Sequence, residues 1–136
     1  MAVQIDIVYT GSLQCKAAHA PSGKTLATEA PVDNGGKGES FSPTDLVAAA
    51  LGSCILTIMG LVAQRNGLDI AGATVRVLKE MTATPTRRIG ALKVSVEYPK
   101  DKPVAPADRA KLEMAAKACP VKQSLHPDIE VTIDFS

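Results

Sequence analysis

The first ten residues alternate between apolar and polar side chains, which is the pattern of a β-strand with one buried face. Every second residue from Val3 to Tyr9 is apolar, and side chains two positions apart share a face of a strand. Gly11-Ser12 ends this segment, and further strands are predicted over 13–20 and 24–29. The simplest arrangement is a three-stranded meander, followed by a loop over 31–41.

A helix is predicted to start directly after this loop. Ser42 can cap it, Pro43 suits its first position, and Asp45 can compensate the free amides of the first turn. Asn66-Gly67 supplies a stop signal, so we expect the helix to end near Arg65.

The interior of this predicted helix is uncharged throughout. Its 18 residues 46–63 reach the length of a membrane span. A helix that is apolar all round can equally form the buried centre of a soluble fold. We favour the buried helix, because the run contains Gly52 and Gly60 and the other segments are amphipathic.

The second half of the chain contains both the two-residue alternation of strands and the period of about 3.6 residues that is typical of helices. Leu92, Val94 and Val96 alternate with polar residues, as in a half-buried strand. The predicted elements are strands over 73–81 and 92–98, a connection over 82–90 carrying Arg87 and Arg88, a helix from 103–106 to Cys119, and a strand over 129–135. The order βββ-α-ββ-α-β predicts an α+β fold, and the length predicts a single domain, 1–136.

Composition and charge exclude several classes of protein. The net charge is +1, so we expect neither a nucleic-acid partner nor an anionic membrane surface. The N-terminus does not resemble a signal peptide, and three cysteines are an odd number for a disulfide framework. The chain is therefore predicted to be cytoplasmic, with reduced cysteines.

Two of the three cysteines lie in unusual surroundings. Cys54 lies within the uncharged helix, where apolar neighbours raise the pKa of a thiol and favour a structural role. Cys119 precedes Pro120, so its helix ends there and its sulfur can cap a new turn. Free amides at that cap, with Lys117 and Lys122 nearby, favour the thiolate. Local sequence thus makes Cys119 the easier thiolate, and leaves open whether either cysteine reacts.

Other candidate sites are weaker. Cys15 lies on a predicted edge strand, and His19 and His126 are isolated. A zinc site built from Cys119 and His126 lacks further ligands at a recognisable spacing. The glycine-rich segment 35–38 does not match a phosphate-binding loop. We therefore expect no bound metal or cofactor.

The segments around Cys54 and Cys119 resemble the OsmC/Ohr family, the osmotically inducible and organic hydroperoxide resistance proteins. The first motif is Gly35-Gly36 followed by SPTDLVAAALGSC, which ends at Cys54. The second is CPVKQSL, from Cys119 to Leu125, and the spacing 119 − 54 = 65 agrees as well. The resemblance covers nearly the whole chain, and the two motifs together are specific.

This resemblance implies an OsmC-like fold with a long buried central helix, in an intertwined homodimer. It implies that Cys54 attacks a hydroperoxide and becomes a sulfenic acid, and that Cys119 then resolves it as a disulfide. It implies no bound cofactor. An external dithiol reductant, lipoyl-type or a low-molecular-weight thiol, would reduce the disulfide.

The chain departs from the peroxidase members of the family in two ways. They carry a glutamate ten residues before the helical cysteine, where this chain has Thr44, followed by Asp45. They also use an arginine from the N-terminal strands, whereas the first arginine here is Arg65. Thr44 and Asp45 are thus the candidate supporting residues of a divergent OsmC-like branch. The candidate cations are Lys16, Lys24, Lys37, Arg87 and Arg88.

Two functions stay open from the sequence. The first is a thiol-dependent peroxidase that reduces organic hydroperoxides in oxidative-stress defence, with Cys54 and Cys119 as its catalytic residues. The second is a dimeric redox-sensing or small-molecule-binding protein without efficient peroxidase activity. The cysteine pair favours the first, and the missing glutamate and arginine favour the second.

Overall fold

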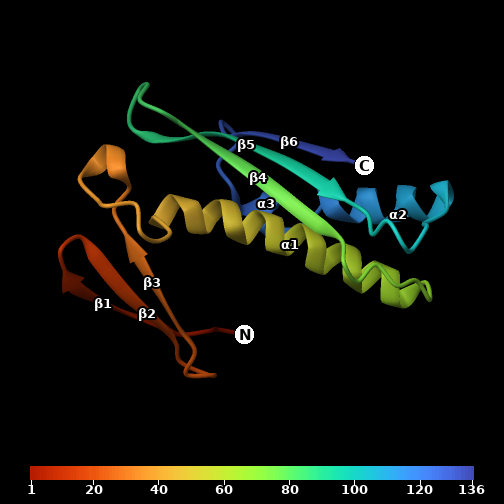
Figure 1. Cartoon of the computed structure of the whole chain (residues 1–136), viewed down its shortest axis with the longest axis horizontal. Coiled ribbons are helices and arrows are strands. Elements are labelled where there is room, and N and C mark those ends of the chain that lie inside the picture. Colours follow the sequence, from red (N-terminus) through yellow and green to blue (C-terminus); the bar gives the residue numbers. More distant parts are fainter. The chain divides into compact units, whose positions relative to one another are not determined.

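The computed structural model describes all 136 residues, which form two compact units, Met1–Val47 and Ala48–Ser136. Figure 1 shows the elements of both. The single domain expected from the length stays a prediction, and the two units are described separately below.

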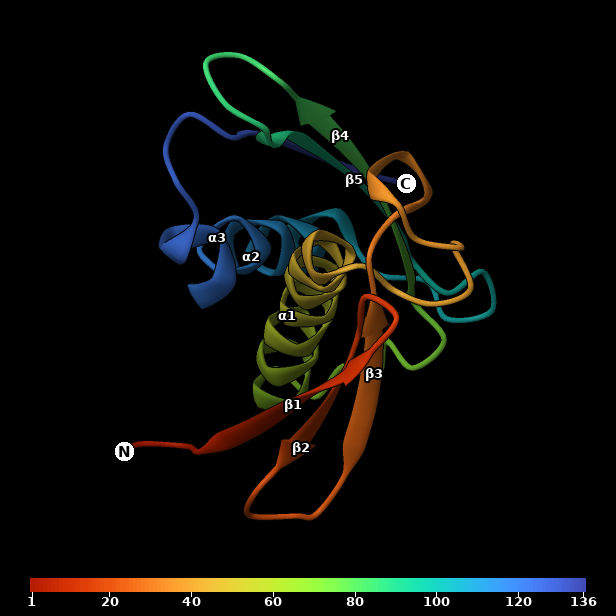
Figure 2. The same cartoon turned by 90° about the vertical axis from the view of Figure 1, so that its left-hand side faces the viewer.

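The N-terminal unit contains the predicted meander. Strands β1 (Ile5–Gly11), β2 (Gln14–His19) and β3 (Thr25–Glu29) pair antiparallel in the order β1-β2-β3 (Figure 2). The loop after β3 contains one short 3-10 turn, η1 (Val32–Asn34). The three strands and the following loop are therefore confirmed.

The sequence predicts that the first strand has one buried face, and this prediction is wrong for the single chain. Ile5, Ile7 and Tyr9 are 59%, 64% and 63% exposed. Alternation gives these side chains a common face of the sheet, on which they stay exposed. Exposed apolar side chains gathered on one strand are typical of an interaction surface.

The glycine-rich loop is folded around a buried carboxylate. Glu29 is only 3% exposed, and it accepts hydrogen bonds from the amides of Lys37 at 2.9 Å and Glu39 at 3.2 Å. A Cβ atom at Gly36 would overlap the carbonyl oxygen of Ala30. These contacts hold the loop in a defined conformation, so its glycines have a structural role.

Helix α1 (Pro43–Arg65) starts and ends where the sequence predicts. The Ser42 hydroxyl accepts a hydrogen bond from the Asp45 amide at 3.1 Å, and the Asp45 carboxylate accepts one from the Ser42 amide at 2.9 Å. This reciprocal pair is a capping box, which satisfies two amides that the helix leaves unpaired. The cap explains why the uncharged run begins as a helix at this point.

The C-terminal unit has a second three-stranded sheet. Its strands are β4 (Thr74–Thr82), β5 (Arg88–Glu97) and β6 (Glu130–Phe135), in the order β4-β5-β6. β4 and β5 pair antiparallel, and β5 and β6 pair parallel. Helices α1, α2 (Pro106–Lys117) and α3 (Pro120–Ser124) lie on one face of the sheet (Figure 1). The element order agrees with the α+β prediction, with α3 as an added short helix.

Two boundaries differ from the prediction: α2 ends at Lys117, two residues before Cys119, and β5 begins four residues earlier than expected. Arg88 belongs to this strand, and its guanidinium donates a hydrogen bond to the carbonyl oxygen of Ile89 at 3.2 Å. A bulge between Glu80 and Met81 lets the longer strand pair with β4. Such a bulge leaves no clear signal in the alternation of the sequence.

The core of this unit lies between the sheet and the helices. Leu92, Val94 and Val96 of β5 are at most 1% exposed, and so are Leu51, Ile55, Met59, Leu112 and Ala116 from the helices. The burial of α1 is one-sided, because Leu61 on its other face is 41% exposed. α1 is long and apolar enough to cross a membrane, but the core helix of a soluble protein can have the same length and composition.

Two glycines of α1 give a matched test of this packing. A Cβ atom at Gly52 would lie 3.0 Å from Val77 and 3.2 Å from Val75, whereas at Gly60 it would meet nothing within 4 Å. We expect Gly52→Leu to lower the free energy of unfolding by about 1–3 kcal/mol through overpacking. Gly60→Ala should raise it by about 0.5–1 kcal/mol, because alanine favours the helix. Urea denaturation measures both, and a stabilising Gly52→Leu contradicts the close approach of α1 to β4.

Candidate functional site

The fold brings Cys54 and Cys119 together. Cys54 lies in the middle of α1, and Cys119 lies directly before α3. The two thiols are close enough for Cys54 to raise the pKa of Cys119, and all three cysteines of the chain are free thiols. Two thiols that are distant in sequence thus share one site within the C-terminal unit.

Cys54 borders the buried stripe of α1. Leu51 and Ile55, which flank it on the helix, are completely buried, whereas Cys54 itself is only half-buried. Ser53 and Thr57 beside it are exposed. Cys54 therefore lies at the border between the buried and the exposed faces of the helix.

Cys119 caps helix α3 with its side chain. The residue is extended, and its sulfur accepts a hydrogen bond from the Lys122 amide at 3.4 Å. Pro120 ends α2 and starts α3, so that the thiol points at free amides, as the sequence predicts. In contrast to Cys54, Cys119 is completely buried.

The prediction that the capping amides favour the thiolate of Cys119 is wrong. Burial raises the pKa of the Cys119 thiol above its ordinary value of 9.0, and the neighbouring Cys54 raises it further. The amides of Lys122 and Val121 act in the opposite direction but do not outweigh burial. Local sequence showed the capping amides, but it could not show that the sulfur is closed off from water.

The predicted supporting residues lie at the start of α1. Thr44 and Asp45 take part in its cap, where the Thr44 hydroxyl lies 3.2 Å from that of Ser42. Their capping role follows from these contacts. A catalytic role for Thr44 and Asp45 stays a prediction.

The remaining candidates each have their own local surroundings. Cys15 belongs to β2, which is the central strand of its sheet, so its predicted edge position is wrong. His19 lies 2.6 Å from the Ser22 hydroxyl, and His126 accepts a hydrogen bond from the Asp128 amide at 3.0 Å. No group of three or more His, Cys, Asp or Glu side chains is placed to hold a metal ion.

A family model described as OsmC-like protein matches residues 36–134, and this stretch contains both cysteines. The chain belongs to the OsmC-like family. A solved structure of a candidate osmotic stress induced and detoxification response protein from Psychrobacter arcticus 273-4 is 39% identical to it. That OsmC-like match has a TM-score of 0.90 and covers 97% of this chain and 94% of the other. No curated protein matches.

More distant structures confirm the OsmC-like fold. An organic hydroperoxide resistance protein OsmC from Legionella pneumophila is 16% identical, with a TM-score of 0.78 over 100% of this chain and 97% of the other. The organic hydroperoxide resistance protein OhrB of Bacillus subtilis is 13% identical, with a TM-score of 0.72 over 100% and 98%. At these identities the likeness concerns the fold alone.

Proposed function

We propose that this protein is a thiol-dependent peroxidase that reduces organic hydroperoxides. The observation that carries the proposal is the proximity of a half-buried thiol, Cys54, to a buried one, Cys119. The half-buried thiol can react with a hydroperoxide, and the buried thiol lies close enough to react with the sulfenic acid that forms. The names of the hydroperoxide resistance proteins that share the fold support the same chemistry.

The first step oxidises Cys54. Its thiolate attacks the terminal oxygen of the hydroperoxide ROOH, the O–O bond breaks, and the leaving alkoxide takes a proton to become the alcohol ROH. Cys54 becomes a sulfenic acid, two electrons more oxidised than the thiol.

The second step involves Cys119. Its sulfur attacks the sulfenic sulfur of Cys54, a disulfide forms, and the hydroxyl leaves as water. An external dithiol, lipoyl-type or a low-molecular-weight thiol, then returns both cysteines to thiols and becomes a disulfide itself. No bound cofactor takes part in this cycle.

The proposal includes a homodimer in the cytoplasm that acts in oxidative-stress defence, without nucleic-acid or membrane partners. The exposed apolar side chains of β1 and the exposed face of α1 supply surface that a second copy can cover. The net charge of +1 gives no attraction to nucleic acid or anionic lipid.

A redox-sensing or small-molecule-binding protein with the same disulfide chemistry is the second candidate. The raised pKa of Cys119 favours it, because a buried neutral thiol resolves slowly. Thr44, which replaces the family glutamate, favours it as well. Stopped-flow oxidation of the reduced protein by cumene hydroperoxide separates the two candidates. A peroxidase loses its thiols much faster than free cysteine does, and a sensor or binding protein does not.

The raised pKa of Cys119 also predicts how disulfide formation depends on pH. Below this pKa, which lies above 9.0, Cys119 is mainly a neutral thiol and only its small thiolate fraction attacks. The rate of the second step should therefore rise by about tenfold per pH unit between pH 6 and 9. Rapid-quench alkylation after a hydroperoxide pulse measures this rate. A rate that levels off near pH 7 contradicts the burial of the resolving thiol.

A further inference from the structure

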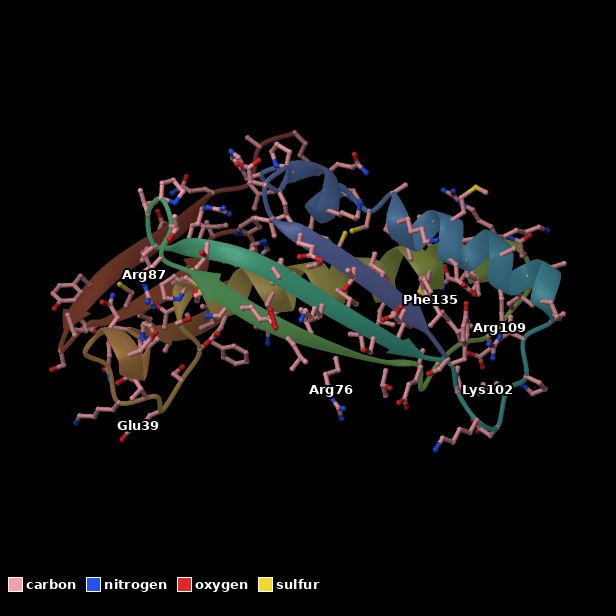
Figure 3. All side chains as sticks on the ribbon, turned by 90° about the horizontal axis from the view of Figure 1, so that it is seen from above. Glu39, Arg76, Arg87, Lys102, Arg109 and Phe135 are labelled. Carbon is pink, nitrogen blue, oxygen red and sulfur yellow. The ribbon has the colours of Figure 1, made fainter.

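A pocket of the C-terminal unit lies where strands β5 and β6 end. Its volume is about 480 Å³, and the side chains around it include Glu97, Tyr98, Pro99, Lys100, Pro103 and Arg109. This volume is in the range of small-molecule sites. Figure 3 shows Arg109 on α2, near Phe135 at the end of β6.

Arg109 is held in one orientation by an aromatic ring. The carbon of its guanidinium lies 4.2 Å from the centre of the Tyr98 ring, which is itself 6% exposed. The Tyr98 hydroxyl donates a hydrogen bond to Glu113 at 3.2 Å, which fixes the ring. A stacked guanidinium loses little freedom when it binds a ligand, so the site is preorganised.

The N–H groups of Arg109 are not used within the protein. Its guanidinium makes neither a hydrogen bond nor an ion pair, and stacking on Tyr98 is its only interaction. Glu113, four residues further along the helix, is engaged by the Tyr98 hydroxyl instead. An arginine with unused donors on a pocket wall can bind a carboxylate or phosphate with two parallel hydrogen bonds.

The other walls of the pocket fit the body of such a ligand. Pro99 and Pro103 supply apolar surface, and Lys100 adds a second cation against the single acidic side chain, Glu97. The main-chain oxygen of Ser136 at the rim already accepts a hydrogen bond from the Tyr98 amide at 2.9 Å. The pocket therefore combines an apolar wall with a cationic donor.

We propose that this pocket binds a small organic anion, whose charged group pairs with Arg109 and whose apolar part lies against the prolines. The site is separate from the thiol pair, because Arg109 is in the first turn of α2 and Cys119 follows its last. The eight steps along the helix from Arg109 to Lys117 span about 12 Å. The proposal goes beyond the peroxidase function and does not depend on it.

The test is a titration of the ¹⁵N-labelled protein, followed by amide chemical shifts at constant ionic strength. Benzoate and phenyl phosphate test the two kinds of anion, and benzamide is the neutral control. We expect saturable shifts at Tyr98, Lys100 and Arg109 with at least one of the anions, and binding of benzamide at least about tenfold weaker. Equal binding of benzamide, or no saturation with either anion, overturns the proposal.

Matched variants separate Arg109 from general effects of charge. Arg109→Gln should weaken the binding of the anion at least about tenfold. Lys102→Gln removes a nearby cation that pairs with Asp69 at 3.1 Å instead of lining the pocket, and it should leave binding unchanged. Equal losses in the two variants contradict a specific site. Cys54→Ser should bind the anion normally, so a failure of the peroxidase proposal leaves this one standing.

Discussion

Replacing Cys54 by serine is expected to abolish the reaction with cumene hydroperoxide. A hydroxyl in place of the thiol cannot form a thiolate, and Cys119 cannot take over because it is buried and its raised pKa keeps it neutral. The rate should fall on the order of 10⁴-fold, the scale of removing one member of a catalytic unit. Stopped-flow measurement of hydroperoxide consumption by the reduced protein gives this rate directly.

Cys15→Ser is the matched control for this variant. Cys15, on β2, takes no part in the proposed cycle, so its loss should leave the rate within about twofold of the parent protein. Full activity in Cys54→Ser would assign the attack to another thiol. Equal losses in both variants would point to damage of the fold instead.

The second large effect is expected when Cys119 is replaced by serine. Cys54 still reacts with hydroperoxide, but its sulfenic acid has no partner thiol and accumulates. Turnover with an external dithiol should fall at least about tenfold, because the disulfide on which that reductant acts can no longer form. Dimedone labelling followed by mass spectrometry should find the adduct at Cys54 in most of the chains.

Alanine at the same position separates resolution from capping. The Cys119 sulfur caps α3 through the Lys122 amide, and serine can keep that hydrogen bond whereas alanine cannot. Both variants should accumulate the sulfenic acid. Only Cys119→Ala should also lose about 0.5–2 kcal/mol in the free energy of unfolding. A disulfide that still forms rapidly in either variant rules out Cys119 as the resolving residue.

Much of the fold could be predicted because its signals are local. The capping residues Ser42 and Asp45 and the stop at Gly67 define α1, and Pro120 separates α2 from α3. The alternation around Val94 identifies β5. Each of these signals acts through neighbours a few residues away, so the start, end and type of these elements can be predicted from the local sequence.

The predictions that are wrong concern properties that depend on contacts between residues far apart in the sequence. The exposure of Ile7 on β1 and the central position of β2 depend on what packs or pairs with each strand. The pKa of Cys119 differs from the prediction for the same reason, since burial raises it by more than the local amides lower it. The proximity of Cys54 to Cys119 came from family resemblance and could not be derived from their spacing.

The most direct test of the account is to map the disulfide that hydroperoxide produces. Reduced protein is treated with about one equivalent of cumene hydroperoxide, alkylated, digested without reduction and analysed by mass spectrometry. We expect two of the three thiols to disappear and a peptide linking Cys54 to Cys119 to appear, with Cys15 alkylated. Oxidation that leaves Cys119 alkylated and forms no such link contradicts this expectation.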